Sequence, residues 1–291
     1  MKILVVGLGL IGGSICKALH MYTEHSVYGC DRNPEVLEEA CATGVIDGIE
    51  QEDCSSFDLI MVCLYPKAIR TWVETHLPTI SEGTIVADVS GVKTDIPVTL
   101  GALCAAKGVH YIGTHPMAGK ERSGYSVSDE DLFQGANFIL TPTSFTPNYV
   151  VAQMKNLAHQ IGFRRFVITT PEMHDHMIAY TSQLAHVVSS SYVKSPVLDL
   201  ECGFSGGSFH DMTRIATMNE DMWAMLFMEN RESLLCELDT LIANLGEYRE
   251  ALAQADEEKV YNLIREGRLR KEENLERRRH SPSVIHLTDQ K

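Results

Sequence analysis

The feature that most constrains this chain is a glycine-rich turn directly after its first apolar segment. Residues 3–6 form a short apolar run typical of a buried strand, and a G-x-G-x-x-G pattern follows at residues 7–12. In such a loop the first glycine permits the turn, the second lets the backbone approach a pyrophosphate, and the third lets the next helix pack closely. The helix beyond the loop offers unpaired N–H groups to phosphates, so the pattern predicts dinucleotide binding. The expected cofactor contacts in this turn are Gly7, Gly9, Leu10, Ile11 and Gly12.

An acidic residue stands where dinucleotide-binding folds hold a ribose. A second strand is expected over residues 26–30, and Asp31 follows it, roughly 20 positions beyond the glycines. Because a carboxylate accepts hydrogen bonds from a ribose diol and repels a 2′-phosphate, Asp31 favours NAD over NADP. Arg32 is interpreted as an adenine or phosphate contact, with a solvated surface charge as the alternative. Tyr65, at the end of a later strand, is a further expected cofactor contact.

Composition limits the class of protein. A hydrophobic fraction of 44% over 291 residues supports a real core. The net charge of −14 argues against nucleic acid or an anionic membrane as the main partner, although a local basic pocket still permits an anionic substrate. No apolar run is long enough to span a bilayer, and the first strand begins too early for a signal peptide. Eight cysteines without a C-x-x-C pair indicate reduced packing residues, so we expect a cytoplasmic protein.

The chain divides into two parts with different sequence patterns. Up to about residue 170, buried apolar runs alternate with helical stretches, which predicts a Rossmann-type, doubly wound α/β sheet. The last strands of this part are expected to run antiparallel, because their connections are less helical. The strands expected after the first two are residues 58–64, 83–89, 109–114, 137–141 and 165–169.

The second part has helical periodicity and no clear strand. Its apolar Met and Leu stripe is interpreted as core or subunit interface, so we expect a homodimer formed through an all-helical dimerisation domain. The glycine-rich loop at 202–208 is either a connector or a close approach to a ligand or partner subunit. The expected helices are residues 172–193, 211–217 with Asp211 as N-cap, 220–244, and a charged helix from 257 to 280. The predicted domains are a dinucleotide-binding domain at 1–170, a helical substrate and dimerisation domain at 171–280, and a frayed tail at 281–291.

Polar residues follow the predicted strands at the points where the strands end. In open α/β sheets ligands bind at the carboxyl ends of the strands, and Ser90 and His115 would lie at that edge beside the glycine loop. A histidine is the usual general base for removing a hydroxyl proton during hydride transfer, so His115 is the candidate base. The alternative is a structural histidine. Ser90 is predicted to hydrogen-bond the histidine or the substrate, with a plain turn serine as the alternative.

The helical part carries further candidates. Arg214 suits a carboxylate ligand, with an ion pair to Asp211 as the alternative. Ser182 and His186 lie one helical turn apart and share a face. No metal site is expected, because the two histidines that flank Asp175 would face different ways on a helix and no third ligand has a convincing spacing.

Four features in order resemble the prephenate dehydrogenase family, which also includes arogenate and cyclohexadienyl dehydrogenases. They are the nucleotide-binding half, His115-Pro116-Met117-Ala118-Gly119, Pro171-Glu172-x-His174-Asp175, and Asp211-x-Thr213-Arg214-Ile215-Ala216. The resemblance implies an N-terminal dinucleotide domain and a helical domain that dimerises. It also implies NAD-dependent oxidative decarboxylation of prephenate to 4-hydroxyphenylpyruvate in tyrosine biosynthesis.

The same resemblance assigns roles to residues of this chain. His115 would polarise or deprotonate the ring 4-hydroxyl as hydride leaves that carbon, with Ser90 in support. The substrate-binding positions that it implies are Arg214, His186, Ser182 and, as a pocket-gating acid, Glu121. Prephenate carries two carboxylates, and Lys120 is a further cation that would offset them. Some relatives have histidine where this chain has Gln183, which leaves the choice between prephenate and arogenate open.

Two other functions stay open at this point. One is a different dehydrogenase built from a nucleotide domain and helices, such as a β-hydroxyacid dehydrogenase. Those enzymes place a catalytic lysine on the helical domain, whereas the first long helix here presents His186 beside Ser182. The other is a non-catalytic NAD-binding sensor, which would need the glycine loop but not His115 and Arg214 together.

Overall fold

The computed structural model describes residues 1–120 and 122–287 and divides the chain into two compact units. Unit 1 comprises Met1–Asp175 together with the segment from Val284 on, and unit 2 is His176–Ser283. The first unit thus extends five residues past the predicted boundary at 170, and the chain returns to it at the end. Over the described ranges, the structure contains no helix with the length and apolar character needed to cross a membrane.

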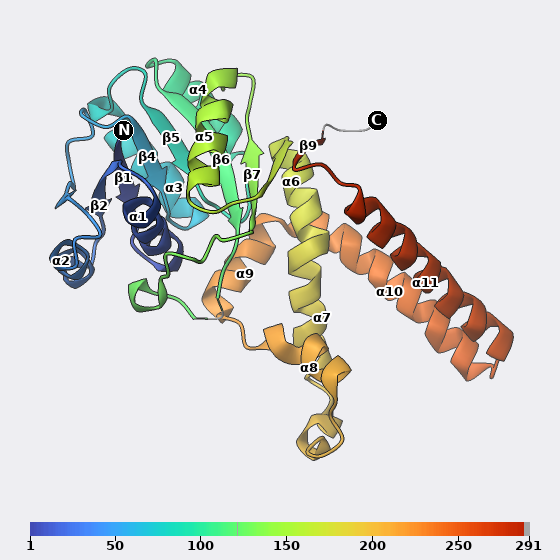
Figure 1. The fold of residues 1–291 in the computed structure, drawn as a ribbon. Coiled ribbons are helices and arrows are strands. Elements are labelled where there is room, and N and C mark those ends of the chain that lie inside the picture. The colour runs from blue at the N-terminus through green and yellow to red at the C-terminus, as the bar shows by residue number, and fades with distance from the viewer. Residues whose placement is uncertain (121, 288–291) are drawn as a thin grey trace. The chain divides into compact units, whose positions relative to one another are not determined.

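Unit 1 is built on one sheet whose strands follow the order β3-β2-β1-β4-β5-β6-β7-β8-β9 (Figure 1). The strands are β1 (Lys2–Val6), β2 (Ser26–Cys30), β3 (Gly48–Ile49), β4 (Leu59–Val62), β5 (Ile85–Asp88), β6 (His110–Met117), β7 (Asn137–Thr141), β8 (Arg165–Thr169) and β9 (Val284–Leu287). The helices that connect them are α1 (Leu10–Tyr22), α2 (Pro34–Ala42), α3 (Pro66–His76), α4 (Ile96–Ala105) and α5 (Asn148–Gln160). The order 3-2-1-4-5-6 is that of a dinucleotide-binding doubly wound fold, which confirms the predicted fold class.

The direction of the strands follows from their connections. Strands β1 to β6 pair in parallel, and helices connect most of them along the chain. In the described part of the link from β6 to β7 the helical structure is a short 3-10 turn, Tyr125–Val127, and these two strands pair antiparallel. Strands β8 and β9 then run parallel to β7. The prediction of antiparallel last strands is therefore confirmed for β7 against β6, whereas β8, which follows the helix α5, pairs in parallel with β7.

Both faces of the sheet are covered, which explains the continuous apolar runs in the sequence. Side chains of a strand alternate between faces, so Ile3 and Val5 belong to one apolar cluster, and Leu4 and Val6 to the other. The first cluster takes in buried residues of α1, α2 and α5, and the second takes in those of α3 and α4. Full burial of one such aliphatic side chain contributes about 1.5–3 kcal/mol, so these clusters hold the sheet together.

The prediction of a frayed tail is wrong for Val284–Leu287. This segment is β9, and it pairs in parallel with β8, with Phe166 opposite Val284 and Thr169 opposite Leu287. Val284 packs against the first apolar cluster of unit 1. The strand forms because the edge of β8 offers unpaired backbone groups, a property of the sheet that a four-residue segment does not reveal by itself. Residues 288–291 of the predicted tail lie outside the described residues.

The first long helix of the second part contains an irregular turn. It consists of α6 (Pro171–Ile178), a π-helical turn at Ala179–Gln183, and α7 (Leu184–Tyr192). The expected helix over 172–193 is therefore present as one helical run. A π turn inserts an extra residue into the helix, and such turns occur frequently at functional sites.

Two expected helices have different bounds in the structure. Asp211 is not an N-cap, since α8 (Gly207–Thr213) already starts at Gly207 with Gly206 in the cap position. Glycine is an acceptable N-cap. The sequence prediction took the glycine-rich stretch as a loop and therefore began the helix four residues too late. The third expected helix is divided at Asn230 into α9 (Glu220–Glu229) and α10 (Arg231–Ala253).

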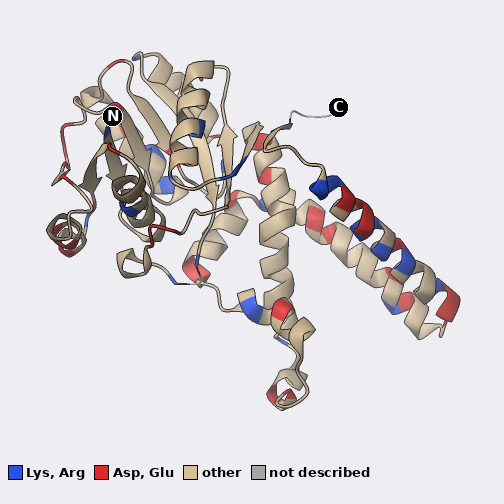
Figure 2. Cartoon of the chain, in the orientation of Figure 1, with Lys and Arg blue, Asp and Glu red and all other residues tan. Residues whose placement is uncertain are grey.

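The charged helix expected near the C-terminus is α11 (Glu257–Arg279), capped by Asp256, which accepts the Lys259 N–H at 2.9 Å. Figure 2 shows residues of both charge signs interleaved along it. One of its pairs, Arg268 with Glu272, is spaced i, i+4 at 2.7 Å. All eight cysteines are free thiols, and Cys202 and Cys236 are exposed, so the packing role predicted for the cysteines is wrong for these two.

Candidate active site

The glycine loop after β1 has the shape that close approach of a ligand requires. Gly7 has a φ of +87°, and a Cβ added there would lie 2.6 Å from the Cys63 carbonyl oxygen. A Cβ on Gly12 would lie 1.9 Å from the Gly7 carbonyl oxygen, so the contact of α1 with the loop excludes any side chain. At Gly9, by contrast, an added Cβ meets nothing within 4 Å. The open side of the loop therefore faces free space, as a nucleotide cradle needs.

The start of α1 adds hydrogen-bond donors to this cradle. The helix begins at Leu10 with Gly9 as N-cap, and no side chain caps it. The N–H groups of its first turn, which includes Leu10, Ile11 and Gly12, have no acceptors within the helix. These donors and the helix dipole suit a phosphate.

Asp31 is held beside the loop by backbone hydrogen bonds. Its Oδ2 accepts the Leu8 N–H at 2.7 Å and its Oδ1 accepts the Asn33 N–H at 2.8 Å. Each carboxylate oxygen has further acceptor capacity, which a ribose diol would use. Arg32 is exposed, and Tyr65 precedes α3 with its side chain 59% exposed. The residues present thus fit a dinucleotide, and the individual contacts of Arg32 and Tyr65 stay predictions.

His115, near the carboxyl end of β6, is joined to a second histidine and a carboxylate. Its Nδ1 lies 2.9 Å from His174 Nε2, and His174 Nδ1 lies 2.7 Å from Asp175 Oδ1. His174 is 1% exposed, so this chain of hydrogen bonds is shielded from water. A Cβ added at Gly91 would lie 3.7 Å from His115 Nε2, so this glycine keeps space beside that nitrogen.

Asp175 is in turn fixed by the segment that follows β5. Its Oδ1 accepts the Lys93 N–H at 2.7 Å, and its Oδ2 accepts the Thr94 N–H at 2.5 Å. The Lys93 side chain is fully buried, and its Nζ lies 2.6 Å from Asp88 Oδ1. Tyr111 donates a hydrogen bond from its hydroxyl to Asp88 Oδ2 at 2.9 Å. The buried charges are therefore paired and hydrogen-bonded, as buried ionic groups must be.

These surroundings set the protonation state of the two imidazoles. Burial, then the neighbouring His174, then the Lys93 charge hold the pKa of His115 well below its usual value. Burial also lowers the pKa of His174, although Asp175 opposes that shift. Both rings are therefore neutral near pH 7, and a neutral imidazole is the form that accepts a proton.

Ser90 makes a local turn. Its Oγ donates to the Val92 carbonyl oxygen at 2.7 Å, and its own N–H donates to Asp88 Oδ1 at 2.8 Å. The hydroxyl is thus directed to the backbone two residues on, which is the turn interpretation of this serine. Its predicted support of His115 has no direct hydrogen bond in this structure, and a contact with the substrate stays a prediction.

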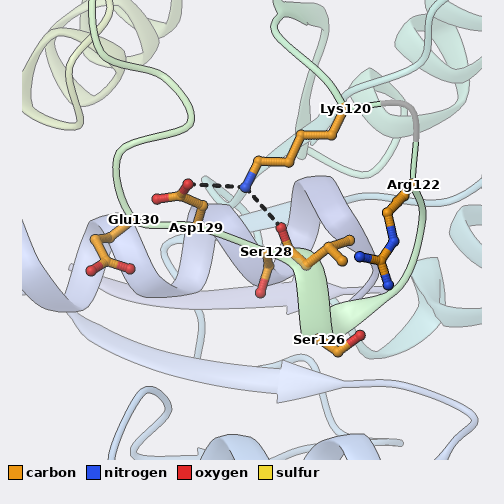
Figure 3. A pocket seen from close by; sticks show the side chains of 7 residues that line it. Lys120, Arg122, Ser126, Ser128, Asp129 and Glu130 are labelled. Carbon is orange, nitrogen blue, oxygen red and sulfur yellow. Dashed lines mark hydrogen bonds and ion pairs between the residues drawn. The ribbon is translucent and has the colours of Figure 1, made fainter.

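Lys120 lies at a shallow pocket of about 420 Å³ (Figure 3). Its Nζ lies 2.9 Å from Asp129 Oδ2 and donates to the Val127 carbonyl oxygen at 3.1 Å. A substrate carboxylate would therefore compete with Asp129 for this ammonium group. The pocket is lined by Lys120, Arg122, Ser126, Val127, Ser128, Asp129 and Glu130. Glu121, the predicted gating acid, lies outside the described residues.

Unit 2 holds the remaining predicted site residues. His186 stacks on Trp223 with ring centroids 3.7 Å apart, and its Nδ1 donates to the Ser182 carbonyl oxygen at 2.9 Å. Arg214 begins the 3-10 turn that follows α8. Gln183 is buried, donates to the Leu226 carbonyl oxygen at 3.0 Å and accepts from Asn230 at 2.8 Å. Gln183 is thus engaged in holding α9 and α10 to the first long helix.

The sequence interpretation missed the roles of His174, Asp175 and Lys93. It weighed His174 and His176 as metal ligands and rejected that interpretation, without assigning either residue another role. In the structure His176 lies 3.9 Å from Glu237, while His174 contacts His115. Across the described ranges, no three His, Cys, Asp or Glu side chains gather in a way that could hold a metal ion. One sequence signal pointed to the contact between His174 and His115. The His174-Asp175 pair lies at the start of a predicted helix, and His115 lies at the end of a predicted strand.

Comparisons with known proteins agree over nearly the whole chain. The sequence profile of the prephenate dehydrogenase nucleotide-binding domain matches residues 15–167, and that of the prephenate dehydrogenase dimerization domain matches residues 170–266. Cyclohexadienyl dehydrogenase of Zymomonas mobilis is 30% identical over 279 residues, which cover 91% of this chain and 93% of that protein.

Two solved structures are similar in fold and sequence. Prephenate dehydrogenase of Aquifex aeolicus, crystallised with hydroxyphenyl propionate and NAD+, has a TM-score of 0.84 and 29% identity, covering 94% of this chain and 98% of that one. Arogenate dehydrogenase of Synechocystis has a TM-score of 0.81 and 27% identity, covering 94% of this chain and 100% of that one.

Proposed function

The chain belongs to the prephenate dehydrogenase family, and from this premise we propose that it catalyses the NAD-dependent oxidative decarboxylation of prephenate to 4-hydroxyphenylpyruvate. One observation carries the proposal. A neutral histidine, His115, stands near the carboxyl end of β6, at the same sheet edge as a loop that fits a dinucleotide. An alcohol oxidation needs a base for the hydroxyl proton of the substrate and an acceptor for the hydride. His115 and a dinucleotide bound at the glycine loop would supply these two components at the same edge.

The proposed chemistry assigns one proton transfer to this chain. NAD, when bound at the glycine loop, supplies the hydride acceptor. His115 takes the proton of the ring 4-hydroxyl while hydride leaves the carbon that bears it. Loss of the ring carboxylate as carbon dioxide makes the ring aromatic, and the proton returns to the phenolate oxygen of the product. Asp31 supports NAD rather than NADP, because its carboxylate would repel a 2′-phosphate.

The substrate carboxylates require cations in a protein whose net charge is −14. Arg214 and His186 are the proposed partners, with Ser182 and Lys120 as further contacts. A hydrogen bond to a charged group contributes about 1.5–3 kcal/mol. Arogenate stays the alternative substrate, since relatives of this chain include a cyclohexadienyl and an arogenate dehydrogenase.

The oligomeric state is part of the same proposal. Residues 170–266 match a dimerization domain, and large apolar side chains of unit 2 such as Leu200 and Phe204 are 73% and 90% exposed in the single chain. We expect a second copy of the chain to cover such residues in a homodimer.

The test is formation of NADH or NADPH by the purified protein with prephenate and with arogenate, each with NAD and with NADP. We expect turnover of prephenate with NAD. Preference for arogenate would correct the substrate and keep the chemistry. NAD binding without turnover of either compound would favour the sensor or another dehydrogenase.

The carboxylate contact has its own test. The substitution Arg214→Gln should raise KM for prephenate about tenfold to a hundredfold, the equivalent of one lost charge-assisted hydrogen bond. An unchanged KM would remove Arg214 from the substrate site.

A further inference from the structure

We infer that His174 and Asp175 are positioning residues that fix which ring nitrogen of His115 carries the proton, leaving Nε2 as the atom that accepts the substrate hydroxyl proton. The inference deepens the proposed function and rests on it for the identity of the substrate. The proton arrangement itself is a property of the protein without substrate, so it is testable separately.

Asp175 accepts hydrogen bonds from two backbone N–H groups of the segment that follows β5. An ionised carboxylate accepts hydrogen bonds and donates none. Its Oδ1 receives the Lys93 N–H at 2.7 Å, and its Oδ2 receives the Thr94 N–H at 2.5 Å. His174 Nδ1, at 2.7 Å from Oδ1, must therefore also carry a hydrogen and donate it. This contact fixes the tautomer of His174.

The tautomer of His174 then determines that of His115. A neutral imidazole has one N–H and one bare nitrogen, so His174 Nε2 is an acceptor. The only hydrogen available for the 2.9 Å contact is on His115 Nδ1. His115 Nε2 is consequently the bare, basic nitrogen. Burial lowers the pKa of both histidines and so keeps both rings in the neutral form that this argument needs.

The surrounding backbone holds this arrangement in one geometry. Thr94 has a φ of +46°, a left-handed conformation unusual for a threonine, and both it and Lys93 direct their N–H groups at Asp175. The buried ion pair of Lys93 with Asp88 ties the same segment to the end of β5. Gly91, in this segment too, leaves room beside His115 Nε2. One turn thus fixes the carboxylate and keeps the basic nitrogen accessible.

The arrangement also stabilises the product of proton transfer. When Nε2 takes the proton, His115 becomes an imidazolium whose Nδ1–H still donates to His174, with the Asp175 charge behind it. Among the residues that the structure describes, Lys93 and Asp88 are further charged groups that act on the two histidines, and they pair with each other, while Tyr111 donates to Asp88. Asp175 is therefore the carboxylate that is directed at the histidine pair.

The first experiment observes the tautomers directly. Protein labelled with 15N in its histidine rings is examined without ligands by long-range 1H–15N correlation at neutral pH, with signals assigned from His115→Gln and His174→Gln spectra. We expect both rings to be neutral with the hydrogen on Nδ1. A hydrogen on Nε2 of either ring would overturn the inference, whatever the substrate proves to be.

The second experiment measures the consequence for turnover. Asp175→Asn keeps the size of the side chain but places an NH2 group against backbone donors. We expect kcat to fall about 10- to 100-fold, by analogy with the loss found when the outer-shell partners that orient metal-bound histidines are removed. The acidic limb of the kcat–pH profile should move to lower pH, because the imidazolium loses its carboxylate, while the NAD dissociation constant should not change.

A matched control lies next to the pair. His176→Gln removes a histidine whose side chain is 51% exposed and lies near Glu237, so kcat and its pH profile should remain those of the wild type. A folded, NAD-binding Asp175→Asn protein with wild-type kcat and pH profile would overturn the positioning role. If Asp175→Asn does not fold, the tautomers of the wild-type protein decide the question. A wild-type protein that does not turn over prephenate would count against the proposed function and leave the tautomer test intact.

Discussion

Unit 1 buries its apolar residues within one chain, whereas unit 2 leaves many of them exposed. The central strands of unit 1 are fully buried, and two apolar clusters cover the two faces of the sheet. Unit 2 has one small cluster of buried residues, Ala179, Leu184 and Leu234. At the same time Leu200 and Leu252 of unit 2 are 73% and 68% exposed. The difference is that unit 1 buries its apolar residues within one chain, whereas unit 2 leaves large apolar side chains exposed, as the proposed homodimer requires.

The two units also use polar groups differently. Unit 1 buries Asp88, Lys93 and His174 in one hydrogen-bonded network next to the candidate base. The charges of α11 in unit 2, in contrast, lie on a helix with no buried residues. Buried polar networks fix a single geometry, since an unsatisfied member is costly, while exposed pairs contribute little. The comparison fits the proposed function, in which the proton transfer takes place in unit 1 and the dimer forms through unit 2.

The largest expected effect is that of a substitution at the candidate base of unit 1. His115→Asn should lower kcat about 10²- to 10⁴-fold, the usual contribution of a general base, with an unchanged NAD dissociation constant. The control is His110→Asn on the same strand, whose ring contacts Tyr149 at the other end of β6. Steady-state NADH formation and NAD titration measure both. Retention of wild-type kcat in His115→Asn would exclude His115 as the base.

A smaller effect tests whether the exposed apolar residues of unit 2 form an interface. Ile242 and Leu245 lie one turn apart on α10 and are 57% and 58% exposed. Burial of each such side chain contributes about 1.5–3 kcal/mol, so replacing both by Glu should convert a dimer into a monomer that still binds NAD. Light scattering with chromatography measures the mass. The matched change in unit 1 is Leu103→Glu, at a residue 39% exposed, which should leave the mass unchanged.

An unchanged mass of the Ile242→Glu, Leu245→Glu protein would mean that this face of α10 is not the interface. The exposed apolar side chains of unit 2 would then need another explanation than a dimer interface on this face.

The smallest expected effect is on the pH dependence of the free energy of unfolding, to which the buried histidines of unit 1 should contribute. The pKa values of His115 and His174 are lowered in the folded state, chiefly by burial. Below the unfolded value of about 6.5 the unfolded chain therefore binds more protons, and the free energy of unfolding falls as pH decreases. Urea unfolding between about pH 7 and pH 5.5 measures this slope. It should be shallower in His115→Asn, and an equal slope in both proteins would contradict the assigned pKa shifts.

Local sequence patterns predicted the parts of the molecule that depend on neighbouring residues. The glycine loop, Asp31 after β2 and the buried strands follow from turn chemistry and from periodicity. The rule that ligands bind at the carboxyl ends of parallel strands predicts His115 at the candidate site from the sequence. The bounds of α8 and the division at Asn230 were less predictable, because glycine caps and buried polar contacts override helical periodicity.

The sequence by itself thus determined the fold class, the dinucleotide turn and the candidate base, because each is encoded in a short stretch of chain. Only the tertiary structure decided that His174, 59 residues from His115, is its partner, and that Asp175 is held by Lys93, 82 residues away. It also decided that Val284–Leu287 becomes a strand, since the edge of β8 supplies the hydrogen bonds. Contacts of this kind depend on how distant elements pack, and no local period or spacing carries that information.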